Sequence, residues 1–107
     1  MELYLKTRAG ANAVGEYNPV TKEMVVRKGS IVAPDVHTEG KFRSANSVIK
    51  YRELYCDGIK ARQDVAFKSA STAANFVTGR STNGLEAWKN SDGNMSADMT
   101  FIVKKTM

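Results

Sequence analysis

The segment from Phe67 to Trp88 constrains the fold most, because it combines a helix start, a helix stop and a tight turn within 22 residues. Ser69 is a favoured N-cap residue, so the sequence predicts a helix over residues 70–78. Gly79 readily adopts the left-handed conformation that ends helices. The helix should bury its apolar face, which consists of Ala73, Ala74, Phe76 and Val77.

The second half of this segment reads as a turn and an anchor. Asn83-Gly84 is a strong turn signal. Residues 85–89 then form either a strand or a short ordered segment that carries Trp88 inward. A single tryptophan in a small domain is more often a core residue than a base-stacking platform.

Upstream, apolar and polar residues alternate as they do in half-buried strands. The pattern predicts strands over residues 3–8, 9–17 and 23–28, with a turn at 18–22 between the last two. Small residues on one side of the second strand would let another element pack closely against it. Those inward positions are Ala11, Ala13 and Tyr17.

A first helix is predicted over residues 44–57, with Gly58 ending it. Its apolar stripe is Val48, Tyr51, Leu54 and Tyr55. Further along, an extended piece carries Val65 and Phe67 inward, and alternation over residues 99–103 suggests a closing strand. The expected fold is α+β, with a small antiparallel sheet led by an N-terminal hairpin and two helices packed on one face.

Size and composition narrow the class of protein. A chain of 107 residues is expected to form one domain, with a hairpin-rich part at 1–40 and a helical part at 41–95. Its apolar runs are too short for a membrane span, and no signal peptide is visible. One cysteine and one histidine, His37, argue against a disulfide framework and against a zinc site. We therefore expect a cytoplasmic protein without a cofactor.

The excess positive charge is unevenly distributed along the chain. Acidic and basic residues cancel in residues 1–40 and again in 90–107, whereas residues 41–89 hold nine basic side chains against four acidic ones. A basic surface attracts phosphate backbones through counterion release, although a net charge of +5 also suits an ordinary solvated surface. Lys50 and Arg52 are candidate contacts within this basic half.

Polar residues at the two ends of the predicted second helix are the other candidates for binding. Ser69 and Ser71 lie in the first helical turn, where free N–H groups suit a phosphate, and Lys68 precedes them. Arg80 follows the helix end and can hold a phosphate or read guanine, while Asn83 can pair with adenine. Each has a structural alternative: Ser69 as an N-cap, Arg80 as a partner of helix-end carbonyls, and Asn83 as a turn residue.

Several of these features together carry a resemblance to a known family. The chain resembles a domain of unknown function that follows GIY-YIG nuclease modules in bacterial proteins, with a pattern close to F-S-S-P-S-A-A-A, G-R-S-x-N-G-W and W-K. That domain is in turn similar to the RAMA domain, named for restriction enzymes and adenine methylases. The matching residues are Phe67-Lys68-Ser69-Ala70-Ser71-Thr72-Ala73-Ala74, Gly79-Arg80-Ser81, Asn83-Gly84 and Trp88-Lys89.

The resemblance covers about residues 41–95 and departs from the pattern twice. Ala70 replaces the usual proline, and Leu85 replaces a tryptophan, which removes an aromatic ring that could stack on a base. No nuclease module is present in this chain. The resemblance implies a DNA-associated accessory module of restriction–modification systems, with the sensing of modified bases as one implied use.

The leading hypothesis is therefore a non-catalytic nucleic-acid-binding module that binds duplex DNA through a basic face. The alternative is a protein-interaction or assembly domain, including a homo-oligomer, that uses an exposed sheet edge near Ile31-Val32 or Thr100–Val103. An enzyme is the third and lowest-ranked option. No spaced carboxylate pair and no Ser–His or Cys–His arrangement stands out in the sequence.

Overall fold

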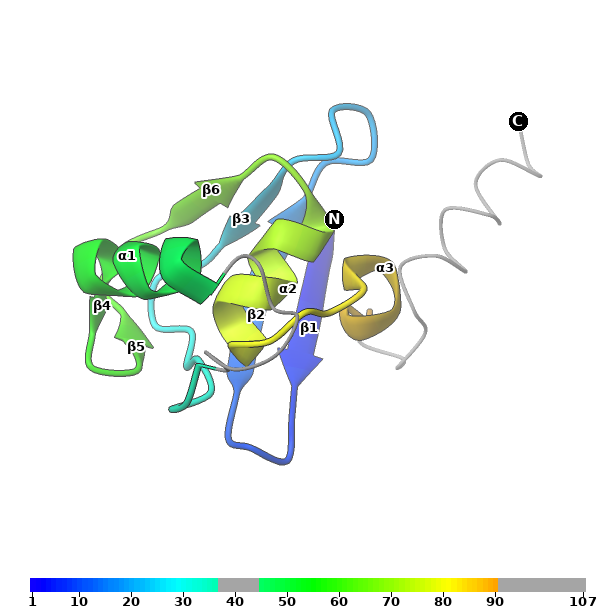
Figure 1. Cartoon of the computed structure of the whole chain (residues 1–107). Helices are drawn as coiled ribbons and strands as arrows, with labels where there is room; N and C mark the ends of the chain where they lie inside the picture. The colour runs from blue at the N-terminus through cyan, green and yellow to red at the C-terminus, as the bar shows by residue number, and fades with distance from the viewer. Residues whose placement is uncertain (37–44, 91–107) are drawn as a thin grey trace.

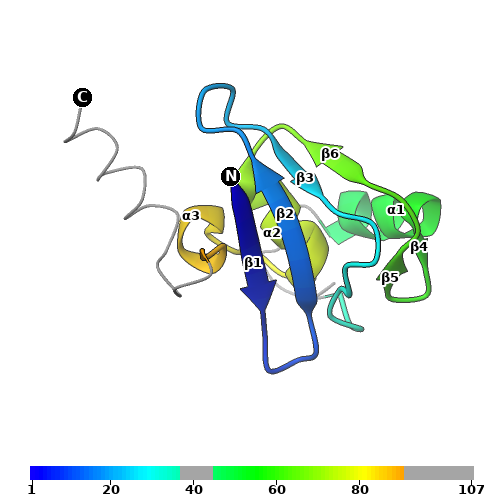
Figure 2. The same cartoon turned by 180° about the vertical axis from the view of Figure 1, so that it is seen from behind.

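A computed structural model describes residues 1–36 and 45–90 of the chain. Its main sheet is antiparallel, with the strand order β1-β2-β3-β6. The helices α1 and α2 lie on one face of this sheet, and the opposite face is open to the viewer in Figure 2. The predicted α+β fold is thus confirmed. The strands of the main sheet are β1 (Glu2–Lys6), β2 (Asn12–Tyr17), β3 (Met24–Val26) and β6 (Val65–Phe67).

The first two strands follow the predicted alternation of inward and outward side chains. β1 pairs with β2 so that Leu3 lies opposite Gly15 and Leu5 opposite Ala13, and all four residues are buried. At the other end of β2, the side-chain oxygen of Asn18 accepts hydrogen bonds from the next turn, as a capping asparagine does. The N-terminal hairpin, the strand that follows it and their connecting turn are confirmed.

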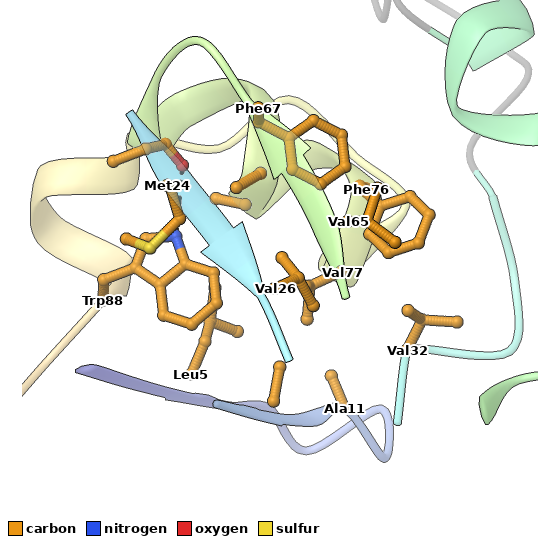
Figure 3. Close-up of a cluster of buried hydrophobic side chains, with 14 of the residues drawn as sticks. Leu5, Ala11, Met24, Val26, Val32, Val65, Phe67, Phe76, Val77 and Trp88 are labelled. Atoms are coloured by element: carbon orange, nitrogen blue, oxygen red, sulfur yellow. Dashed lines mark hydrogen bonds between the residues drawn. The ribbon is translucent and has the colours of Figure 1, made fainter. Parts of the chain in front are cut away.

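Gly15 shows why small residues are needed on the inner face of β2. A Cβ atom at this position would lie 2.7 Å from Met24 Sδ and 3.0 Å from Trp88 Cζ3, closer than packed atoms come. The glycine therefore makes room for the indole, which lies next to Met24 in the core (Figure 3). The expected close approach of another element to this strand is confirmed.

Helix α2 (Ala70–Thr78) has the predicted boundaries and caps. Ser69 Oγ accepts a hydrogen bond of 3.1 Å from Thr72 N. Gly79 ends the helix in the left-handed conformation, with a φ of 73°, and its N–H donates to Asn75 O. The predicted inward residues are all buried in the core: Ala73, Ala74, Phe76 and Val77. Figure 3 shows Phe76 and Val77 among the other core side chains.

Helix α1 (Ala45–Tyr55) ends earlier than predicted. Cys56 and Asp57 form a short strand, β4 (Cys56–Asp57), that pairs with β5 (Lys60–Ala61). Gly58, with a φ of 62°, lies in the turn of this hairpin and is not a helix stop. The hairpin is held by backbone bonds to residues 29–32, and these long-range partners replace the bonds that another helical turn would form.

The buried face of α1 also differs from the prediction. Val48 is buried, but Tyr51 is 38% exposed and Leu54 is 50% exposed. The helix instead turns Arg52 toward α2, where the arginine donates hydrogen bonds to backbone carbonyls. We attribute this orientation of α1 to the backbone carbonyls of α2. Buried carbonyls need hydrogen-bond donors, and an apolar stripe supplies none.

Asn83-Gly84 does not form the predicted tight turn but begins a third, short helix, α3 (Gly84–Ala87). Asn83 caps this helix by accepting a hydrogen bond from Leu85 N. Gly84 is packed against the backbone of Ala70 so closely that a Cβ atom would overlap it. The prediction for Trp88 is confirmed, since its side chain is fully buried.

The prediction of a free sheet edge near Ile31-Val32 is wrong. Ile31 bridges Asn12 on one side and Lys60 on the other, and Val32 N donates to Ile59 O at 2.8 Å. The edge is therefore already paired within the chain. The predicted strand at 99–103 and the loop with His37 lie outside the described residues.

Cys56 is a buried small residue, and its reactivity can be predicted. The residue is 6% exposed, and burial raises the pKa of its thiol, which lowers the thiolate fraction at neutral pH. We expect slow labelling by a thiol reagent in the folded protein and fast labelling in denaturant. Equal rates in both conditions would contradict this placement.

Candidate nucleic-acid interface

Arg80 lies in a loop that the end of α2 holds in place. The buried Thr78 hydroxyl accepts a hydrogen bond from Arg80 N at 3.3 Å and lies 2.8 Å from Thr82 Oγ1. Asn75 Oδ1 accepts a further hydrogen bond from Thr82 N at 2.9 Å. These contacts fix the backbone, while the Arg80 side chain is exposed.

This loop forms one wall of an open groove of about 580 Å³. The other wall is the end of β1 and the turn that follows it. The chain after α3 returns to β1, because Tyr4 and Lys89 exchange two backbone hydrogen bonds of 2.7 and 2.9 Å. The groove is lined by Leu5, Lys6, Thr7, Arg8, Ala9, Thr78, Arg80, Thr82, Glu86, Ala87 and Lys89.

Four cations and one carboxylate line this basic groove. Lys6, Arg8, Arg80 and Lys89 are exposed, and their side-chain nitrogens form no hydrogen bond or ion pair with any residue of 1–36 or 45–90. Glu86 is the carboxylate. Unpaired cations around one concave surface raise the local potential and concentrate anions there.

Only Arg80 of these four cations was a predicted site residue. Lys6 and Arg8 lie in residues 1–40, where acidic and basic residues cancel, and this balance hid their position in space. They are two residues apart near the end of a strand, and that spacing was the available signal. Lys89 joins them through the bridge to Tyr4, which the sequence does not reveal.

The first turn of α2 lies apart from the basic groove. Ser69 caps the helix, and Ser71 Oγ accepts a hydrogen bond of 3.1 Å from Gly84 N, which ties α3 to α2. Lys68 is exposed beside them. Helix α2 is nine residues, or about 13 Å, long, and Ser69 and Arg80 lie beyond its opposite ends, so the predicted residues do not form one cluster.

The remaining predicted site residues lie elsewhere. Asn83 caps α3 with its side-chain oxygen, and Lys50 is exposed on α1. Neither residue lines the basic groove.

Arg52 lies between α1 and the end of α2. Its Nε and Nη2 donate to Phe76 O at 3.1 and 2.8 Å, and Nη1 donates to Ala33 O at 2.7 Å. A further bond of 3.3 Å reaches Val77 O. Burial lowers the pKa of this guanidinium. Its donors are thus used to satisfy carbonyls at the end of α2, which lack partners within their own helix.

Comparison with known proteins places the chain in a family. The sequence model of a domain of unknown function, DUF4357, matches residues 3–100. The chain belongs to the DUF4357 family. No curated protein and no solved structure matches the chain. The family match includes the N-terminal strands as well as the motifs between Phe67 and Lys89, so both walls of the basic groove belong to this DUF4357 domain.

Within residues 1–36 and 45–90, no group of three or more His, Cys, Asp or Glu side chains is arranged to hold a metal ion. In the same parts of the chain, no helix has both the length and the apolar character that crossing a bilayer requires.

Proposed function

We propose that this DUF4357 domain is a non-catalytic nucleic-acid-binding module that binds duplex DNA. The observation that supports the proposal is the basic groove, in which Lys6, Arg8, Arg80 and Lys89 have no acidic partner among the described residues. Such cations gain free energy when they contact phosphates, because condensed counterions are released from the DNA. The Arg80 loop supports it too, since internal hydrogen bonds hold its backbone in one conformation, which lowers the entropic cost of binding.

The resemblance of the motifs to the domain that follows GIY-YIG nucleases, and to the RAMA domain, adds a finer proposal. The domain would serve as an accessory that brings a larger bacterial restriction–modification protein or system to DNA. The sensing of a modified base is a separate matter, and duplexes with and without N6-methyladenine test it directly.

The groove predicts how binding responds to salt. Four phosphate contacts give a slope of about −3.6 in a plot of log K against log salt, or about 150-fold weaker binding at 200 mM than at 50 mM salt. Replacing Lys6 and Lys89 with alanine should reduce the slope to about −1.8, which corresponds to about a 12-fold loss over the same interval. Fluorescence anisotropy with a labelled duplex measures both.

A matched control removes the same charge elsewhere. Lys28 and Lys60 are exposed lysines outside the groove, so the variant with alanine at both positions also loses two positive charges. It should keep a slope near that of the parent protein. Absence of binding at low salt would refute the proposed function. Equal losses of affinity in the two double variants would show that the basic groove is not the binding surface. Circular dichroism confirms that each variant is folded.

A further inference from the structure

We infer that the basic groove binds the sugar–phosphate backbone of DNA and does not read base edges. This inference rests on the proposed function and specifies which part of the nucleic acid the groove contacts. It predicts binding that is independent of base sequence and of base methylation, so that any selectivity would have to come from another part of a larger assembly.

The charges of the groove suit phosphates. Its four cations come from three separate parts of the chain: the end of β1 and its turn, the loop after α2, and the residue that follows Trp88. A backbone places negative charge at regular intervals along its length, so cations on both walls of one groove can each contact a phosphate. Glu86 opposes anion binding, but among the described residues that line the groove it is one carboxylate against four cations.

Several side chains that read bases are absent from the described lining of the groove. Among residues 1–36 and 45–90, the lining contains no aromatic ring for stacking and no asparagine or glutamine for pairing with adenine. Trp88 is fully buried, and its indole N–H donates to Ala70 O at 3.1 Å. Asn83 lies outside the groove, and its side-chain oxygen already accepts a hydrogen bond from Leu85 N.

The threonine hydroxyls of the groove already form hydrogen bonds within the protein. Thr7 Oγ1 accepts a hydrogen bond from Ala11 N at 3.2 Å, and the hydroxyls of Thr78 and Thr82 bond to each other and to Arg80 O. Recognition therefore rests mainly on lysine and arginine. Lysine contacts phosphates chiefly as a point charge, and the two arginines of the groove, Arg8 and Arg80, are the groups here best suited to read guanine as well.

The test uses four labelled duplexes of equal length with the full chain. One contains only A·T pairs, one only G·C pairs, one carries N6-methyladenine, and one carries neutral methylphosphonate linkages along part of one strand. We expect the first three affinities to agree within about threefold, because a base-reading contact changes affinity by roughly fivefold or more per base pair. The methylphosphonate duplex should bind more weakly than its charged counterpart, and inorganic polyphosphate should compete.

The groove variants separate the possible results. Replacing Lys6 and Lys89 with alanine should weaken binding to the three charged duplexes by the same factor, while the Lys28 and Lys60 control should not. A G·C preference that disappears in Arg8→Lys or in Arg80→Lys would overturn the inference and leave DNA binding intact. So would a methylation preference of more than about fivefold that the groove variant abolishes. Absence of binding to all duplexes would refute the proposed function, and the inference with it.

Discussion

Replacing Trp88 with alanine is expected to lower the free energy of unfolding by about 3–5 kcal/mol, the usual cost of removing a large aromatic from a core. The side chain is fully buried next to Gly15 and Met24 (Figure 3), and its N–H satisfies Ala70 O. Removal would leave a cavity between β2 and α2 and would delete the indole hydrogen bond to Ala70 O. Urea denaturation followed by circular dichroism measures the change without relying on tryptophan fluorescence.

Two further variants make this prediction specific. Leu85→Ala removes a side chain of α3 that is 38% exposed, so it should cost much less than Trp88→Ala. Trp88→Phe keeps most of the buried area but loses the indole N–H, and its cost should lie between the other two. A Trp88→Ala protein as stable as Leu85→Ala would show that the indole does not anchor the core.

Replacing Arg52 with methionine is expected to lower the free energy of unfolding by about 2–3 kcal/mol, because charge-assisted hydrogen bonds are lost and Phe76 O, near the end of α2, loses its guanidinium donors. The three nitrogens of Arg52 serve Phe76 O, Val77 O and Ala33 O together, and so connect α1 to α2 and to the segment before α1. Arg52→Lys should recover only part of the loss, since one ammonium cannot reproduce the planar fork of a guanidinium. Urea denaturation measures each variant.

Lys50→Met is the matched control for Arg52. Lys50 is an exposed cation on the same helix, so its replacement removes the same charge while the carbonyl contacts remain. Its stability should change by less than about 0.5 kcal/mol, as surface substitutions usually do. If both variants lost the same stability, the charge of α1 and not the hydrogen bonds of Arg52 would be responsible. The Arg52 variant should also bind DNA like the parent if binding is confined to the groove.

The elements that the sequence predicted best depend on local chemistry. Helix α2 begins after Ser69 and ends before Gly79 because a side-chain oxygen caps one end and a residue without a Cβ ends the other. The first three strands likewise follow from alternation, and the turn between β2 and β3 follows from the capping side chain of Asn18. Each of these signals is decided within a few residues, so neighbouring elements did not change them.

The predictions that failed depend on partners distant in sequence. Cys56 and Asp57 left the helix because the hairpin they form bonds to residues 29–32. Asn83 caps a helix because Gly84 packs on the backbone of Ala70, which holds the chain in a helical turn. A turn signal such as Asn-Gly predicts only that the chain changes direction. Tertiary contacts determine whether it does so in a tight turn or at the start of a helix.

The candidate site shows the same division. From the sequence, Arg80 was a candidate for binding, and its place after α2 was predicted. The other cations of the groove were not predicted. Lys6 and Arg8 come from the other end of the chain, and a single bridge to β1 brings Lys89 to the groove. Arg52 is the opposite case. It lies in the basic half of the sequence, but its side-chain nitrogens donate to backbone carbonyls within the protein.

The sequence from Phe67 to Trp88 by itself determined one capped helix, its buried face and a core tryptophan, because propensity and capping act over a few residues. Only the tertiary structure decided which cations share a surface. Charge counted along the chain pointed to residues 41–89, whereas the basic groove takes Lys6 and Arg8 from β1 and its turn, and Arg80 and Lys89 from the two ends of the segment that contains α3. The physical reason is that side-chain charges act through space, and sheet pairing sets the distances between them.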